Sequence, residues 1–264
     1  MSEAAREPVR LERRGTVALV TLDRPERMNA LSRAAVESIG RIGRELSKDP
    51  SVRACVLTGA GDKAFCAGAD LKERQGMTRE QVQEMLALYR SELGWLASSD
   101  FPTIAAINGV ALGGGLELAL TCDLRAATET ALLGLPETGL AIIPGAGGTQ
   151  RLPRLIGEAR ALDLILTGRR VAPQEALSFG LINLLVPSSE DLLEKTLTWL
   201  SPIANGAPIA QRAALRAVRA TSSLTLEQGL AFELEQYELC LHSADREEAL
   251  AAFAEKRKPK FSGR

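Results

Sequence analysis

The segment Pro102–Leu120 constrains the fold most strongly, because it is the least polar stretch of the chain. Its length would suit a membrane-spanning helix, but four glycines interrupt it, and Asn108 and Glu117 lie inside it. A buried strand over Thr103–Ile107, a glycine-rich turn and a buried helix explain the pattern better. The sequence therefore predicts a buried strand–turn–helix unit with one carboxylate in its helix.

Strand and helix patterns alternate along the first three quarters of the chain. Ser32 is expected to cap one helix, and Thr78 with Gln81 forms a capping-box signal before another. The predicted strands cover Val17–Leu22, Val52–Thr58, Thr103–Ile107, Leu124–Ala127 and Leu181–Val186. Such alternation is typical of an α/β fold with a parallel sheet.

The pattern becomes purely helical from about Ser188. Three successive helices are predicted, at Pro208–Ala220, Thr225–His242 and Asp245–Lys256. We therefore expect a catalytic core over residues 1–200 and a helical region over 201–264. Apolar stripes on these helices, such as Leu226 and Leu230, predict that this region takes part in assembly.

Composition excludes several classes of protein. The net charge of −1 creates no strong field toward nucleic acid or an anionic membrane, and aromatic residues make up only 4% of the chain. The four cysteines lack CxxC spacing, which favours free thiols in a reducing compartment. The start, MSEAAREPVR, has no apolar run and contains two glutamates, so we expect a cytoplasmic protein, or one of an organelle matrix if a transit peptide has been removed.

His242 is the only histidine of the chain, and it lies in an amphipathic helical pattern. A surface or interface position is the simplest interpretation of this residue. Because a single histidine cannot form a cluster of metal ligands, no metal is expected. The position of His242 also argues against a Ser–His–Asp site. Any proton transfer must then use a carboxylate, Lys, Tyr or Cys.

Three segments have the features of a ligand site. In the first, Ala111–Leu120, three glycines before a helix expose backbone N–H groups that suit an oxyanion, although they could also serve close packing alone. Glu117 is the lone charge of this segment, and burying it is costly unless something uses it. This residue favours a functional interpretation.

The second segment, Phe65–Leu71, contains small residues that would allow a ligand to approach the backbone. Cys66 could be a nucleophile, but no histidine base is near it in sequence, and Asp70 could simply cap the next helix. In the third segment, Gly134–Leu152, Glu137 follows Pro136 and could merely begin a helix. The glycines before Thr149 suggest another loop shaped against a ligand or a helix start.

Together, the motifs AGAD, GGG-x-E, P-E and IPG-x-GGTQRL resemble those of the crotonase (enoyl-CoA hydratase/isomerase) superfamily, from about Val9 to Phe261. The resemblance implies a spiral of ββα turns and a helical C-terminal region that builds homotrimers or hexamers. It implies that the N–H groups of Ala69 and Gly114 form an oxyanion hole, and that Glu117 and Glu137 are the catalytic carboxylates. No cofactor is implied, because coenzyme A is part of the acyl-CoA substrate.

The resemblance also implies contacts with coenzyme A. The matching positions are Arg27, Ala67, Asp70, Leu71, Lys72, Tyr237, Phe253 and Lys256. Tyr237 replaces a more usual Phe, and the last three can reach coenzyme A from a neighbouring subunit. No membrane or nucleic acid is implied as a partner.

Both carboxylate positions are retained, which favours a hydratase over an isomerase. The phrases GADLKER and ETGLAIIP look like those of methylglutaconyl-CoA hydratases. Such a substrate ends in a second carboxylate that needs a cation. Arg74, Arg79, Arg151 and Arg154 are the candidates, with Arg151 open to a structural interpretation.

Two alternatives stay open. One is a general short-chain enoyl-CoA hydratase or isomerase. The other is an RNA-binding or scaffolding protein on the same fold, suggested by the basic segments 10–14 and 256–260. A solvated tail and contacts to the phosphates of coenzyme A would also explain these charges. In the enzymatic case, we expect Glu117 to deprotonate water and Glu137 to exchange the α-proton.

Overall fold

The computed structural model describes residues 7–264, which divide into two compact units. The first comprises residues 7–99 and 103–199, and the second comprises Asp100–Pro102 and Leu200–Arg264. The boundary between the two units lies inside helix α9 (Ser189–Ala204). The first six residues lie outside the described part, and with them most of the segment on which the prediction about targeting rests.

A six-stranded sheet forms the centre of the first unit, in the order β1-β2-β3-β5-β7-β9. Its strands are β1 (Val9–Arg14), β2 (Val17–Leu22), β3 (Ala54–Gly59), β5 (Thr103–Ile107), β7 (Leu124–Thr128) and β9 (Leu184–Val186). The pairs from β2 to β9 are parallel, whereas β1 pairs antiparallel with β2. The prediction of a parallel sheet is therefore right from β2 onward and wrong at the edge. There, the turn at Gly15 (φ 62°) folds β1 back along β2.

A second, three-stranded sheet consists of β4 (Ala64–Cys66), β6 (Val110–Leu112) and β8 (Leu132–Gly134). Each of these strands follows one strand of the larger sheet, namely β3, β5 or β7, and each is followed by a helix. Every turn of the chain thus adds one strand to each sheet and then a helix, which confirms the spiral of ββα turns. Strands of three residues are too short to show alternation, so the sequence did not predict them.

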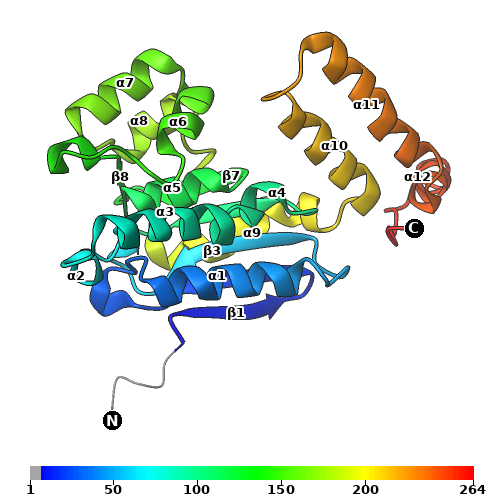
Figure 1. The fold of residues 1–264 in the computed structure, drawn as a ribbon. Helices are drawn as coiled ribbons and strands as arrows, with labels where there is room; N and C mark the ends of the chain where they lie inside the picture. Colours follow the sequence, from blue (N-terminus) through cyan, green and yellow to red (C-terminus); the bar gives the residue numbers. More distant parts are fainter. Residues whose placement is uncertain (1–6) are drawn as a thin grey trace. The chain divides into compact units, whose positions relative to one another are not determined.

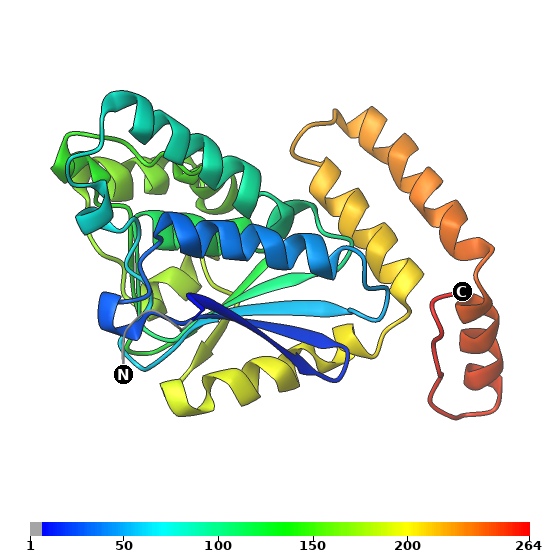
Figure 2. The ribbon, with the colours of Figure 1, turned by 60° about the horizontal axis from the view of Figure 1, so that its bottom comes forward.

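Helices α1 (Arg33–Leu46) and α3 (Arg79–Leu93) lie side by side over one face of the larger sheet (Figures 1 and 2). Both begin at the predicted caps. Ser32 Oγ accepts from the N–H of Ala35, and the capping box of Thr78 and Gln81 is complete. The other helices of this unit are η2 (Pro25–Arg27), α2 (Leu71–Arg74), α4 (Trp95–Ser98), α5 (Gly114–Thr121), η3 (Glu137–Leu140), α6 (Gly148–Ile156), α7 (Glu158–Thr167) and α8 (Pro173–Ser178).

Two predicted strands begin later than expected. β3 begins at Ala54 instead of Val52, and β9 begins at Leu184 instead of Leu181. Val52, Leu181 and Ile182 are nevertheless buried. Hydrophobicity predicted their burial correctly but did not show where strand pairing begins. Among the described residues, none of the helices is long and apolar enough to cross a membrane.

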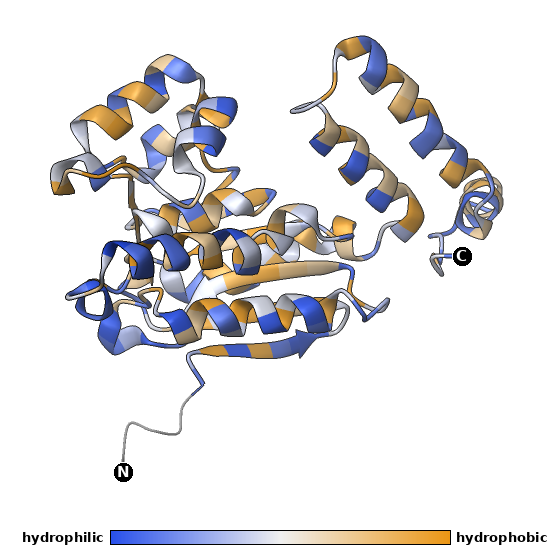
Figure 3. Ribbon diagram, in the orientation of Figure 1, coloured by the Kyte–Doolittle hydropathy of each residue, from blue (hydrophilic) through white to orange (hydrophobic). Residues whose placement is uncertain are grey.

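The second unit contains α10 (Pro208–Ala220), α11 (Leu226–Leu241) and α12 (Ala244–Ala254), close to the predicted bounds. Its tail folds back along α12, because the carboxylate of Asp245 accepts from the N–H groups of Ser262 and Gly263. Figure 3 shows apolar and polar residues mixed over α10 and α11, whereas the central strands of the first unit are mostly apolar. Leu226 and Leu234 are 80% and 62% exposed, respectively.

Candidate active site

Helix α5 places Glu117 in the interior of the first unit. The helix begins after Gly113, whose φ of 53° and ψ of −127° favour glycine. Every residue from Gly115 to Thr121 is buried, and Glu117 is only 3% exposed. The predicted burial of this carboxylate is therefore correct, and the question becomes what stabilises its charge.

The loop before α6 supplies that stabilisation. Glu117 Oε1 accepts hydrogen bonds from the backbone N–H groups of Ala146 (2.8 Å) and Gly148 (2.7 Å). A Cβ on Gly148 would lie 3.0 Å from the same oxygen, so glycine allows this close approach. The glycines before Thr149 therefore begin a helix, as one interpretation of the sequence held, and the loop binds a carboxylate of the protein itself.

Glu137 approaches the beginning of α5 from another element. It is the first residue of η3, directly after Pro136, and it is 9% exposed. A Cβ on Gly113 would lie 3.1 Å from Glu137 Oε1. Its other oxygen, Oε2, is buried and has no hydrogen-bond partner in residues 7–264. The spiral thus brings two glutamates from separate turns of the chain to the same region.

The two carboxyl groups have different electrostatic environments. Burial raises the pKa of Glu137 from 4.5 to about 7, and the nearby charge of Glu117 adds to the rise, while the backbone N–H of Glu137 opposes it. Burial also raises the pKa of Glu117, but the N–H groups of Gly148 and Ala146 and the charge of Arg151 oppose this effect. Glu137 is therefore the better proton donor near neutral pH, and Glu117 is the better stabilised anion.

Two backbone N–H groups lie close to each other beside these glutamates. A Cβ on Gly114 would be 3.5 Å from the nitrogen of Ala69, so the start of α5 faces the loop after β4. Within residues 7–264, neither of these N–H groups donates a hydrogen bond. Unpaired neighbouring donors of this kind suit a developing oxyanion.

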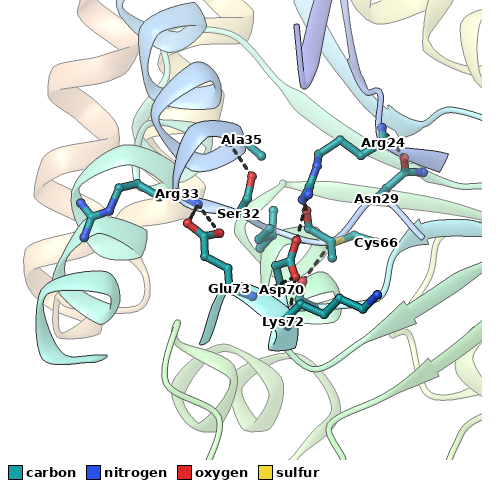
Figure 4. Close-up of polar contacts among 12 residues, drawn as sticks. Arg24, Asn29, Ser32, Arg33, Ala35, Cys66, Asp70, Lys72 and Glu73 are labelled. Carbon is teal, nitrogen blue, oxygen red and sulfur yellow. Dashed lines mark hydrogen bonds and ion pairs between the residues drawn. The ribbon is translucent and has the colours of Figure 1, made fainter. Parts of the chain in front are cut away.

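The loop after β4 is held in place by its neighbours (Figure 4). Asp70 caps α2, since its Oδ1 accepts from the N–H groups of Lys72 and Glu73, and its Oδ2 accepts from Arg24 (2.9 Å). The carboxylate of Asp70 is therefore occupied by the protein, as the capping interpretation expected. Leu71 and Lys72 are exposed, and Ala67 is half-buried.

The other residues that the resemblance connected with coenzyme A lie on the surface of their own units. Arg27 is exposed in η2 of the first unit. Tyr237 and Phe253 are 60% and 86% exposed in the second unit. Lys256 follows α12 with a left-handed φ of 56°. Their contact with coenzyme A stays a prediction.

Two residues with alternative interpretations can be placed. His242 follows α11 with its side chain 83% exposed, as the surface interpretation expected. Cys66 is buried, and burial raises its pKa to about 12, so the nucleophilic thiolate is disfavoured. Among the described residues, no three His, Cys, Asp or Glu side chains are grouped as metal ligands would be.

Sequence reasoning did not predict the roles of Arg24 or Tyr89. Arg24 is a half-buried cation that forms an ion pair with Asp70. Local sequence patterns do not predict a partner that is 46 residues away. Tyr89 lies in α3, where helical spacing predicted its burial and nothing more. Its pKa is raised by burial, with smaller effects from the charges of Arg74 and Glu117. Its hydroxyl donates to the carbonyl oxygen of Leu31 (3.4 Å).

The chain matches the profile of the enoyl-CoA hydratase/isomerase family over residues 12–264 and belongs to this family. The crystal structure of an enoyl-CoA hydratase from Bacillus anthracis superposes with a TM-score of 0.95 at 47% identity, covering 97% of this chain and 100% of that chain.

Two relatives with more specific names are similarly close. A methylglutaconyl-CoA hydratase of Pyricularia oryzae is 42% identical over 300 residues, covering 95% of this chain and 84% of the relative. A short-chain-enoyl-CoA hydratase of Clostridium acetobutylicum is 40% identical over 248 residues, covering 94% and 95%. The predictions of the crotonase fold and of a hydratase-type enzyme are confirmed. The sequence identities to these two relatives are too similar to indicate which of the two substrates this chain uses.

Proposed function

We propose that this enzyme adds water reversibly to the double bond of an α,β-unsaturated acyl-CoA. The observation that carries the proposal is the pair of buried glutamates, Glu117 and Glu137, in unlike environments beside two unpaired backbone N–H groups. Hydration of a conjugated thioester needs an acid, a base and an oxyanion site, and this region offers all three. Family members of the isomerase type are the alternative within the same class.

The chemistry proposed for the site follows from these environments. The N–H groups of Ala69 and Gly114 donate to the thioester oxygen as negative charge develops on it. Glu117 takes a proton from water while the water oxygen bonds to the β-carbon. Glu137 then gives its proton to the α-carbon, which forms the 3-hydroxyacyl product. Transfer of the proton from Glu117 back to Glu137, through solvent, restores the starting state.

The preferred acyl group is proposed to be 3-methylglutaconyl, with 3-hydroxy-3-methylglutaryl-CoA on the hydrated side. The motifs GADLKER and ETGLAIIP support this choice, and so does the relative named a methylglutaconyl-CoA hydratase. The second candidate is a short, uncharged enoyl-CoA, which the relative named a short-chain-enoyl-CoA hydratase favours. A distal carboxylate on the substrate distinguishes the two candidates.

Among the four candidate arginines, Arg74 best fits that carboxylate. Arg74 is the last residue of α2, the short helix that directly follows the loop containing Ala69, and its side chain is half-buried. Arg151 donates instead to the carbonyl oxygen of Ala146, and Arg154 donates to that of Gln150. Arg151 therefore braces the loop that holds Glu117, as its structural interpretation expected.

The test compares kcat/KM for 3-methylglutaconyl-CoA and crotonyl-CoA, with dehydration of 3-hydroxy-3-methylglutaryl-CoA measured in parallel. We expect the dicarboxylic substrate to be preferred, and Arg74→Met to remove that preference while Arg79→Met keeps it. A site that pairs a substrate group discriminates strongly against an analogue that lacks it. Equal or better use of crotonyl-CoA would favour the second candidate, and no turnover of any enoyl-CoA would reject the proposed function.

Assembly and location are proposed on separate grounds. The exposed leucines of α11 support a homotrimer or hexamer, because a solvated helix does not need such a stripe. Four free cysteines, three of them buried, fit a reducing compartment such as the cytoplasm or an organelle matrix.

The RNA-binding alternative receives little support from the basic segments. Arg10 pairs with Asp23, Arg13 with Asp49 and Arg257 with Glu248. These ion pairs neutralise charges that phosphate contacts would need.

A further inference from the structure

Arg24 links two segments that are far apart in sequence, and one of them contains the N–H of Ala69. Its guanidinium donates through Nη1 to the carbonyl oxygen of Ala30 (2.7 Å) and through Nη2 to Asp70 Oδ2 (2.9 Å). The side chains of this ion pair are only 21% and 10% exposed. Figure 4 shows Arg24 reaching from the turn after β2 to the loop after β4.

The turn that contains Arg24 is itself rigidly held. Met28 and Asn29 both have left-handed φ angles, of 52° and 54°, which only surrounding contacts keep in place. Asn29 provides some of these contacts, since its Nδ2 donates to the carbonyl oxygens of Ala60 and Ala64 and its Oδ1 accepts from the N–H of Arg24. The turn is therefore a firm base from which Arg24 can position another segment.

Backbone hydrogen bonds from this turn lie on both sides of Ala69. The N–H of Leu31 donates to the carbonyl oxygen of Gly68 (2.8 Å), and the N–H of Asp70 donates to that of Leu31 (3.2 Å). The N–H of Ala67 donates to the carbonyl oxygen of Met28 (3.0 Å). These bonds fix the peptides around Ala69 and leave its own N–H unpaired.

The ion pair adds a side-chain connection at the end of this loop. Asp70 accepts from Arg24 and also from two N–H groups of α2. Although burial acts to raise the pKa of Asp70, the hydrogen bond from Arg24 and the N–H groups of Glu73 and Lys72 hold it below its ordinary value. The carboxylate thus stays ionised and joins the turn, the loop and α2.

We propose that Arg24 and Asp70 are positioning residues that hold the N–H of Ala69 in place to stabilise the thioester oxyanion. This inference rests on the proposed function, because it assigns the pair to the oxyanion hole. An oxyanion donor acts only within a narrow range of distance, and a displacement of about 1 Å can cost 10²-fold in rate. Arg24 is required because its planar fork serves two acceptors, which the single ammonium of lysine serves less well.

The test uses Arg24→Lys, Arg24→Met and Asp70→Asn, with Glu73→Gln as the matched control. Glu73 lies on the same short helix, and its carboxylate accepts from the N–H of Arg33 but not from Arg24. Asn at position 70 can still cap α2, so the cap is kept while the ion pair is lost. The double variant Arg24→Met with Asp70→Asn leaves no unpaired buried charge, which covers the case in which Arg24→Met alone fails to fold.

Two readouts separate positioning from general instability. The first is kcat per folded active site. We expect it to fall by about tenfold to a hundredfold with little change in KM, because removing an oxyanion donor entirely typically lowers the rate by about 10²–10³ and these variants only displace one. The second is the red shift in the absorbance of a bound dimethylaminocinnamoyl-CoA, which reports polarisation of its carbonyl. The shift should shrink in the three single variants and the double variant, least in Arg24→Lys, and stay unchanged in Glu73→Gln.

The outcomes also separate the two proposals. A wild-type protein that shows neither turnover nor a red shift rejects the proposed function itself. A wild-type protein that shows both, with an unchanged shift and kcat in the Arg24 and Asp70 variants, rejects the positioning role alone.

Discussion

Glu117 and Glu137 are the same residue type in the same buried region, yet their surroundings differ. Glu117 lies within a helix, and one of its oxygens accepts two backbone N–H groups from the loop before α6. Glu137 lies at the start of a short 3-10 helix, and one of its oxygens has no hydrogen-bond partner in the described chain. This difference in surroundings is the basis for proposing opposite proton-transfer roles for two identical side chains.

The largest effect is expected from removing either carboxylate. Glu117→Gln removes the proposed base, and Glu137→Gln removes the proposed acid, while both keep the size of the side chain. Each substitution should lower the rate of hydration by a factor of roughly 10²–10⁴, which is the usual contribution of a positioned acid or base. Steady-state turnover and acyl-CoA binding should be measured together, so that loss of chemistry is not mistaken for unfolding. Full activity in either variant would remove that residue from the mechanism.

Smaller effects are expected from the glycines that touch each carboxylate. Gly113→Ala would place a Cβ 3.1 Å from Glu137 Oε1, at a φ of 53°, and Gly148→Ala would place one 3.0 Å from Glu117 Oε1 and 2.9 Å from the Cβ of Pro144. We expect each to lower kcat/KM by about tenfold or more, because a small misplacement of a catalytic group is costly. Gly139→Ala is the matched control, since nothing lies within 4 Å of its added Cβ. A similar loss of kcat/KM in all three variants would mean that contact with the carboxylates is not the cause.

The last effect concerns the dependence of stability on pH, and it follows from the raised pKa of Glu137. The pKa of Glu137 is raised from 4.5 to about 7, so the folded protein holds its proton more tightly than the unfolded chain. The resulting stabilisation is fully present below about pH 4.5, declines between pH 4.5 and 7, and is lost above pH 7.

Glu137→Gln abolishes this titration. Relative to wild type, the variant should gain up to about 3 kcal/mol in the free energy of unfolding between pH 4.5 and 8. Urea unfolding at several pH values measures the difference, and a constant offset across this range would contradict the raised pKa. In kinetics, hydration by the wild-type enzyme should decline above about pH 7 as Glu137 loses its proton.

The sequence predicted the parts of the site that reside in short motifs. Gly113, Gly114 and Glu117 stand within five residues, so a turn, a helix start and a buried charge could be inferred locally. The role of Glu137 needed the family resemblance, because a Pro-Glu pair also begins ordinary helices.

What the sequence could not predict depends on long-range contact. The N–H groups that hold Glu117 come from residues 29 and 31 positions away, and Arg24 meets Asp70 across 46 positions. The fold shows the same division. Amphipathic helices and most strands of the larger sheet were predicted, whereas the short strands β4, β6 and β8 depend on pairing with partners that are distant in sequence.

The exchange of an α-hydrogen with solvent tests the separate roles of the two glutamates most directly. A saturated acyl-CoA such as butyryl-CoA cannot be hydrated, and its α-hydrogen exchanges with deuterated water if one base and the oxyanion site are present. If Glu137 serves the α-carbon and Glu117 serves water, exchange followed by mass spectrometry should survive better in Glu117→Gln than in Glu137→Gln. The opposite order, with acyl-CoA binding intact in both variants, would contradict the assignment.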